Sequence, residues 1–195
     1  MSFASLRQWH WISSALCLAG MLLFAITGIT LNHATDIKTQ ARVVSIEAVF
    51  PPDLLKNLQQ APPKHGLPTD LNQWIQTEIG ITANSSSAQW TEDELYIAMP
   101  KPGGDAWLSL DLQTGDVLYE STDRGWIAYF NDLHKGRNTG IWWFWFIDVF
   151  AAICVIFSIT GFWLLVRQAN TRLSTWPLTL LGFLLPLLIM LLFIH

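Results

Sequence analysis

Three long apolar stretches divide the chain, and a polar region separates the first stretch from the second. Trp9–Leu31 and Leu173–Ile194 contain no Asp, Glu, Lys or Arg, and Thr139–Val166 is interrupted only by Asp148. About 20 apolar residues cross a bilayer, so each stretch is predicted to be a transmembrane helix. The pattern predicts five segments: tail and first helix (1–33), an external domain (34–138), second helix (139–166), a loop (167–175) and third helix (176–195).

Composition and charge place these segments. The chain is 51% apolar and 13% charged and has eleven Trp, which is typical of an integral membrane protein. The two short segments outside the polar region contribute Arg7, Arg167 and Arg172 and no acid. Residues 34–138 instead hold eight Lys and Arg against fourteen Asp and Glu, a net charge of −6. Arg in short loops marks the cytoplasmic side, so the N-terminus is predicted inside, with the polar domain and the C-terminus outside.

The first apolar stretch also resembles a secretory signal. It is too long for a typical signal core and no convincing small-x-small cleavage site follows it, so we expect a retained anchor. Cys17 and Cys154 lie within spans and the external domain has no cysteine. We therefore expect no disulfide and no cysteine-ligated zinc or iron–sulfur site.

The external domain alternates strand-like and helix-like segments. Residues 43–50 are predicted to form a strand that Pro51 and Pro52 end. A short helical turn and a proline-rich loop follow, and then residues 69–80 form a helix that Gly80 ends. The remaining predicted strands are 87–92, 94–99, 106–112 and 117–121, with turns at paired glycines and at Thr114-Gly115. A helix packed on an antiparallel sheet, an α+β domain, is the simplest way to bury their apolar faces.

A five-residue segment occurs twice. FAITG ends at Gly28 in the first span, and FSITG ends at Gly161 in the second. One interpretation is that the small residue lets helices approach closely. The other is that the glycine makes room for a flat macrocycle between helices. The repeat alone leaves both open.

Three histidines lie at the ends of predicted spans. Twenty-three residues separate His10 from His33, about 34 Å of straight helix, so the two cannot ligate one centre. His134 precedes the second span and returns to the end where His33 lies, so His33 and His134 are a candidate axial pair for a b-type haem. Taken singly, each is more often an interfacial polar residue. That interpretation is preferred for His65 and His195.

Asp148 is a fourth candidate, in the aromatic segment IWWFWFID, which suits a haem wall or an interfacial belt. An intramembrane carboxylate is costly and is a functional candidate by default. It could accept a hydrogen bond from a ligand imidazole, neighbour a propionate, or carry a proton from quinol oxidation. A structural hydrogen bond to a hydroxyl on a neighbouring helix explains it equally well.

Three segments carry a family resemblance: QWHWISSALCLAGMLLFAITGITLNH, DLQTGDVLYE and NDLHKGRNTGIWWFWFIDVFAAICVIFSITGFWLL. They resemble the PepSY-associated transmembrane family in a short, three-span form. The resemblance implies a membrane α-helical protein of the bacterial inner membrane with an inserted α+β PepSY-like periplasmic domain. Better-studied members are haem-containing reductases of ferric siderophores. It therefore implies haem b, one or two per assembly, with His10, His33 and His134 as candidate iron ligands and Gly28, Gly161 and Asp148 beside the cofactor.

The chain departs from the longer members in having fewer spans and one clear histidine at the cytoplasmic end. A complete haem site there would need a second subunit, which a homodimer could supply. The first functional hypothesis is a b-type cytochrome that takes electrons from quinol or another redox partner and passes them to a periplasmic ferric chelate. Such a protein could be a ferric reductase. The sequence assigns no catalytic residue. No Rossmann glycine fingerprint is present, so nicotinamide or flavin would reside on a partner. No nucleic-acid partner is expected.

The alternative hypothesis is a non-enzymatic, membrane-anchored PepSY module that binds a periplasmic partner through its sheet edges. A third is a subunit that assists assembly of a larger complex. The sequence leaves these three open.

Overall fold

A computed structural model describes residues 3–37, 40–60 and 66–194. His65 and His195 lie outside these residues. Among the described residues, three helices are long and apolar enough to cross a membrane: Ser5–Asn32, Gly140–Thr171 and Thr175–Phe193. They correspond to the three predicted spans and, with the inserted sheet domain, confirm the predicted fold class of a helical membrane protein with an inserted α+β domain.

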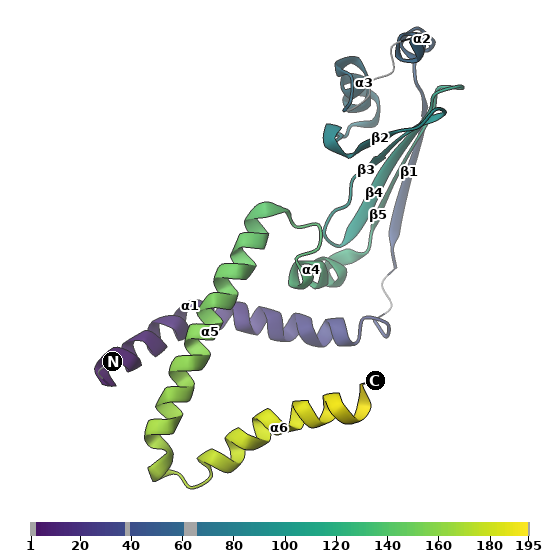
Figure 1. Cartoon of the computed structure of the whole chain (residues 1–195). Helices are drawn as coiled ribbons and strands as arrows, with labels where there is room; N and C mark the ends of the chain where they lie inside the picture. The colour runs from purple at the N-terminus through teal and green to yellow at the C-terminus, as the bar shows by residue number, and fades with distance from the viewer. Residues whose placement is uncertain (1–2, 38–39, 61–65, 195) are drawn as a thin grey trace. The chain divides into compact units, whose positions relative to one another are not determined.

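The membrane helices are α1 (Phe3–Asn32), α5 (Gly140–Gln168) and α6 (Thr175–Phe193) (Figure 1). α5 begins after a turn in which Asn138 and Gly140 both have positive φ, 58° and 77°, a conformation that Asn and Gly adopt at low cost. Its last turn carries Arg167, and a short 3₁₀ turn, η3 (Ala169–Thr171), follows. Apolar side chains cover all sides of these helices, which suits a lipid surround.

The inserted domain contains a five-stranded antiparallel sheet (Figure 1). Its strands, in spatial order, are β1 (Arg42–Val49), β5 (Asp116–Asp123), β4 (Gly104–Asp111), β3 (Glu94–Ala98) and β2 (Ala88–Trp90). The predicted strands are all present. β1 pairs with β5 along its whole length, with Ile46 opposite Tyr119, and it forms one edge of the sheet.

The core of the domain lies between one face of the sheet and two short helices, α2 (Pro52–Gln60) and α3 (Thr69–Trp74). α3 continues as a single π-helical turn, η1 (Ile75–Ile79), and Gly80 ends it at φ 77°. Burial alternates along β4, so its core face follows from the two-residue period of a strand. The fully buried side chains in this core are Phe50, Leu71, Ile75, Leu95, Ile97, Leu108 and Leu110.

One helix was not predicted from the sequence. α4 (Gly125–Lys135) comes just before α5 and ends at Gly136, which has φ 66°. Six of its eleven residues are apolar, but the two residues that it buries are the polar Asn131 and Asp132, so its apolar positions do not mark its buried face. Within the unit formed by residues 24–144, α4 lies between the sheet and the last turns of α1 (Figure 1). Residues 1–23 and 145–195 form the other compact unit.

Candidate functional site

His10 of α1 is held by the FSITG segment of α5. Its Nδ1 lies 3.1 Å from Thr160 Oγ1. Its ring stacks on Phe157, with ring centroids 4.8 Å apart and planes 14° apart. Its Cε1 faces Gly161 so closely that a Cβ added there would lie 3.0 Å from it. Phe, Thr and Gly at positions 1, 4 and 5 of the segment thus share one helix face, as i, i+3 and i+4 residues do.

His134 of α4 is held in the same way by the FAITG segment of α1. Its Nδ1 lies 2.6 Å from Thr27 Oγ1. Its ring lies against Phe24, with centroids 4.9 Å apart and planes at 51°. A Cβ added to Gly28 would lie 3.7 Å from its Cε1, an ordinary contact. Each copy of the repeated segment therefore receives one histidine, and we call these the His10 site and the His134 site.

This arrangement gives the two copies of the segment a shared role. Neither Gly28 nor Gly161 meets the backbone of a neighbouring helix; each faces an imidazole. Gly20 of α1 does meet a neighbouring membrane helix, since an added Cβ would lie 2.3 Å from Cε2 of Phe150 on α5. The repeated glycine was apparent from the sequence, whereas the role of Thr27 and Thr160 was not, although threonine stands at the same position in both copies of the segment.

The hydrogen bonds assign the tautomer of His10. Thr160 Oγ1 donates its only hydrogen toward the carbonyl oxygens of Ile156 and Phe157, at 2.7 and 3.0 Å. It can therefore only accept from His10, so Nδ1 of His10 carries the hydrogen. The Nε2 of a neutral His10 then has a free lone pair, and no residue that the structure describes forms a hydrogen bond with it.

The same argument holds for the other two candidate histidines. Thr27 Oγ1 donates to the Phe24 carbonyl oxygen at 3.3 Å and accepts from Nδ1 of His134. His33 is exposed at the end of α1, and its Nδ1 lies 3.1 Å from the carbonyl oxygen of Ile29. A carbonyl oxygen only accepts, so Nδ1 is again the donor. In all three histidines Nδ1 is hydrogen-bonded to an oxygen, and no residue in the described ranges forms a hydrogen bond with Nε2.

The structure does not join His33 to His134 directly. Within residues 3–37, 40–60 and 66–194, no hydrogen bond or ring contact links the two side chains. His134 instead contacts α1 at Thr27 and Gly28, one to two turns before His33. The pairing of His33 and His134 as axial ligands therefore stays a prediction. Both side chains lie near the C-terminal end of α1.

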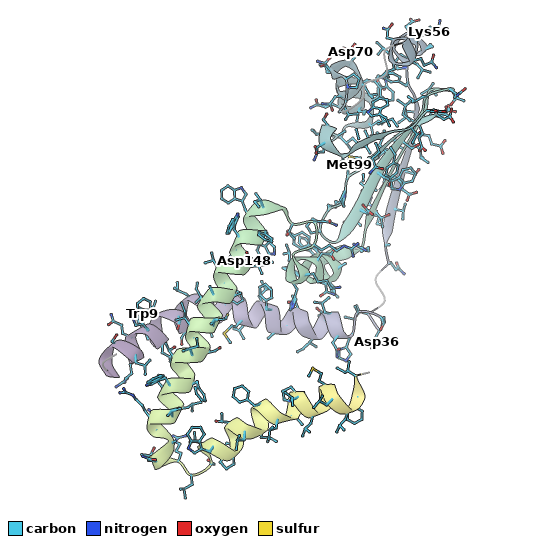
Figure 2. The ribbon with its side chains drawn as sticks, in the orientation of Figure 1. Trp9, Asp36, Lys56, Asp70, Met99 and Asp148 are labelled. Atoms are coloured by element: carbon cyan, nitrogen blue, oxygen red, sulfur yellow. The ribbon has the colours of Figure 1, made fainter. Side chains whose placement is uncertain are left out.

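Asp148 projects from α5 and is exposed (Figure 2). Among the residues that the structure describes, it has no hydrogen bond or ion pair, so neither the predicted hydroxyl partner nor a histidine partner is seen within the chain. The same residues contain no group of three or more His, Cys, Asp or Glu that could hold a metal ion.

A buried polar network holds α4 in place. Thr30 Oγ1 of α1 donates to Asn131 Oδ1 at 2.6 Å. Asp132 Oδ2 accepts from the Gly103 N–H at 2.9 Å and from Arg124 Nη2 at 3.2 Å. Asp132 is 6% exposed, and its partners compensate for its burial. The network connects α4 to both α1 and the sheet, and so positions His134 over Thr27.

Comparison with known proteins gives one match. The model of the family described as "Putative PepSY_TM-like" matches residues 1–195. No curated protein and no solved structure matches the chain. The match covers the three apolar helices and the inserted antiparallel-sheet domain together. The chain is therefore a membrane protein that belongs to the putative PepSY_TM-like family.

Proposed function

We propose that this protein is a b-type haem protein of the bacterial inner membrane that passes electrons across or along the membrane to a periplasmic acceptor. Ferric siderophore or ferric iron is the acceptor class that the family resemblance suggests. The observation that carries the proposal is shared by His10, His33 and His134: Nδ1 lies at hydrogen-bond distance from a protein oxygen, and no described residue forms a hydrogen bond with Nε2. Metal-bound histidines almost always donate their other ring N–H in this way.

The ligand chemistry of these residues fits haem. His10 and His134 are each fixed by three contacts, a threonine oxygen, an aromatic ring and a glycine surface. Haem b needs no cysteine and is held by axial imidazoles. His134 and His33 are candidate ligands at the end of α1 nearest the sheet domain. His10 would serve a second haem, whose other ligand a second copy of the chain would supply.

In this proposal the protein positions the ligands. Thr27 and Thr160 hold the Nδ1–H tautomer, and donation from Nδ1 makes Nε2 the more basic ligand. Phe24 and Phe157 fix the ring planes and help to exclude water. Haem held by these residues would supply one-electron transfer, and the ligand imidazoles and nearby charges would set its potential. Electrons enter from quinol or from a redox partner.

The test is an absorbance spectrum of the full chain, purified after expression with added haem precursor. A Soret band and an α-band that change on dithionite reduction are expected. His134→Ala and His10→Ala should each lower the haem content, whereas His65→Ala, distant in sequence from every span, is the matched control. A colourless protein, or equal haem content in all three variants, would contradict the proposal.

A second candidate function has one observation in its favour. β1 is an eight-residue edge strand with exposed Val43, Val44 and Val49, and such an edge can pair with an extended peptide. A non-enzymatic module that binds a periplasmic partner, or assists assembly of a larger complex, would use it. A partner that co-purifies with the His10, His33 and His134 triple alanine variant, and is lost from a Val43→Lys/Val49→Lys variant, would favour this function.

A further inference from the structure

We propose that a basic pocket beside α4 binds the phosphate of an anionic lipid headgroup. The cavity has a volume of about 260 Å³ and lies between the end of α1 and α4. Leu31 and Ala34 line one side of it, and Arg124, Lys135 and Arg137 bring three positive charges to it. We call it the α4 pocket. The proposal stands independently of the proposed haem.

Among the residues that the structure describes, the positive charges lining the α4 pocket outnumber the negative ones. Asp132 is the acid that lines it, and that carboxylate is paired with Arg124, at 3.2 Å. Neither Lys135 nor Arg137 has an acidic partner among the residues that the structure describes. The pocket therefore carries about two uncompensated positive charges, which favour an anion.

Arg124 adds a second, independent observation. Its Nε is buried and has no hydrogen-bond partner in the described part of the chain, although its Nη2 reaches Asp132. A buried N–H without an acceptor is destabilising, and most buried polar groups in proteins are paired. Nε itself is closed to solvent, but the Arg124 side chain is 39% exposed. The open part of its guanidinium can meet a phosphate oxygen in the pocket, a partner that matches it in geometry and charge.

The position of α4 selects a lipid as the source of this phosphate. α4 exposes Trp126, Ile127 and Phe130, the first of them by 75%, and Trp126 also contacts the rings of Tyr129 and Phe130. Helices that combine exposed aromatic residues with Lys or Arg lie in the membrane interface. Lys135 and Arg137 fall five and three residues before α5 begins at Gly140, which places them at headgroup depth.

Lipid binding here has a consequence for the His134 site. Lys135 and His134 are adjacent on the last turn of α4, and the pocket also contains Asn131, which bonds Thr30 of α1. A headgroup bound between α1 and α4 would hold the two helices together. The lipid would thus support the contact between His134 and Thr27.

The test measures the thermal stability of the full chain in a neutral detergent while dioleoyl phosphatidylglycerol is added. Phosphatidylglycerol should raise the Tm of the parent, whereas phosphatidylcholine should not. In a Lys135→Gln/Arg137→Gln variant the apparent affinity should fall about 30-fold, since each cation at an anionic membrane surface contributes on the order of 1 kcal/mol. The control variant Lys56→Gln/Arg42→Gln also removes one Lys and one Arg, but from the sheet domain, and phosphatidylglycerol should raise its Tm as it does that of the parent.

Two further arms separate the outcomes. The charge-preserving variant Lys135→Arg/Arg137→Lys should keep the response, which shows that loss in the glutamine variant reflects charge and not misfolding. Inorganic phosphate at the same concentration should give no shift. An equal shift with inorganic phosphate would overturn the lipid assignment, and an unchanged response to phosphatidylglycerol in the glutamine variant would overturn the site.

Discussion

Nδ1 of His134 lies 2.6 Å from Oγ1 of Thr27, although 107 residues separate the two in the chain. The same pairing joins His10 to Thr160 across 150 residues. In both cases the threonine hydroxyl donates to its own helix and accepts from the histidine. One short segment, used twice, therefore fixes the orientation and the tautomer of two imidazoles.

Substitution of Thr27 tests the His134 site. Thr27→Val keeps the shape of the side chain and removes the acceptor for Nδ1–H, so the free energy of unfolding should fall by about 1 kcal/mol. Unfolding of the full chain in mixed micelles with increasing SDS measures this loss. ¹⁵N chemical shifts of the imidazole provide a second readout, because the parent should show a protonated Nδ1 and a bare Nε2.

Two variants control this experiment. Thr27→Ser retains the hydroxyl and should keep the nitrogen shifts of the parent. Thr179→Val in α6 removes a hydroxyl that donates to the carbonyl oxygen of Thr175 in its own helix, and it should leave the His134 shifts unchanged. Parent-like shifts in Thr27→Val would contradict the tautomer assignment.

Glycine-to-alanine substitutions should destabilise the protein in a defined order. Gly20→Ala should cost most, about 1–3 kcal/mol, because the ring of Phe150 stands where the new methyl group would lie. Gly161→Ala should cost less, since the ring of His10 need shift only slightly. Gly28→Ala should be neutral or stabilising, because its nearest neighbour is at 3.7 Å and Ala favours a helix.

Gly182→Ala in α6 is the reference for this series, because no atom lies within 4 Å of the added methyl group. SDS-induced unfolding of the four variants, compared with the parent, gives the order. A Gly28→Ala variant less stable than Gly161→Ala would show that the contacts around the two histidines differ from those described.

Asp111 should make the sheet domain sensitive to acid. The backbone N–H groups of Thr114 and Gln113 donate to its carboxylate and lower its pKa below the ordinary value. A carboxyl group whose pKa is lower in the folded chain than in the unfolded chain stabilises the fold at pH values above the unfolded pKa, about 3.9. This stabilisation is lost as the pH falls through the pKa of the folded chain. Asp111→Asn should therefore be less stable than the parent at pH 7 and should lose less stability below pH 4.

The measurement is the unfolding midpoint of the full chain between pH 7 and pH 2, followed by tryptophan fluorescence. The difference between parent and Asp111→Asn should narrow as the pH falls. A difference that is constant over the whole range would mean that the turn between β4 and β5 does not depend on the charge of Asp111.

Asp132 should contribute more to the stability of the fold than an average surface acid does. Asp132→Ala leaves the Gly103 N–H without its acceptor and Arg124 without its partner, so the free energy of unfolding should fall by roughly 1–3 kcal/mol. Arg124 is partly exposed, which keeps the loss below that of a fully buried pair. Asp132→Asn keeps an acceptor for Gly103 and should lose less. Equal losses in the two variants would assign the whole effect to the charge.

Local pattern predicted most of the elements in this protein. The three membrane helices follow from uninterrupted apolar stretches, since no other structure satisfies the backbone of such a segment inside lipid. The five strands follow from β-branched residues between turn residues, and β4 shows the expected alternation of burial. α4 was missed because its length is only eleven residues and its buried side chains include Asn131 and Asp132.

The sequence by itself determined the spans, the strands and the repeated Phe-x-x-Thr-Gly segment, because each depends on neighbouring residues and on the solvent that surrounds them. Only the tertiary structure decided that His134 contacts Thr27 and that His10 contacts Thr160. A membrane helix is apolar on all sides, so its sequence does not state which side meets its neighbour. That choice depends on the rotation and register of helices whose contacts join residues more than a hundred positions apart.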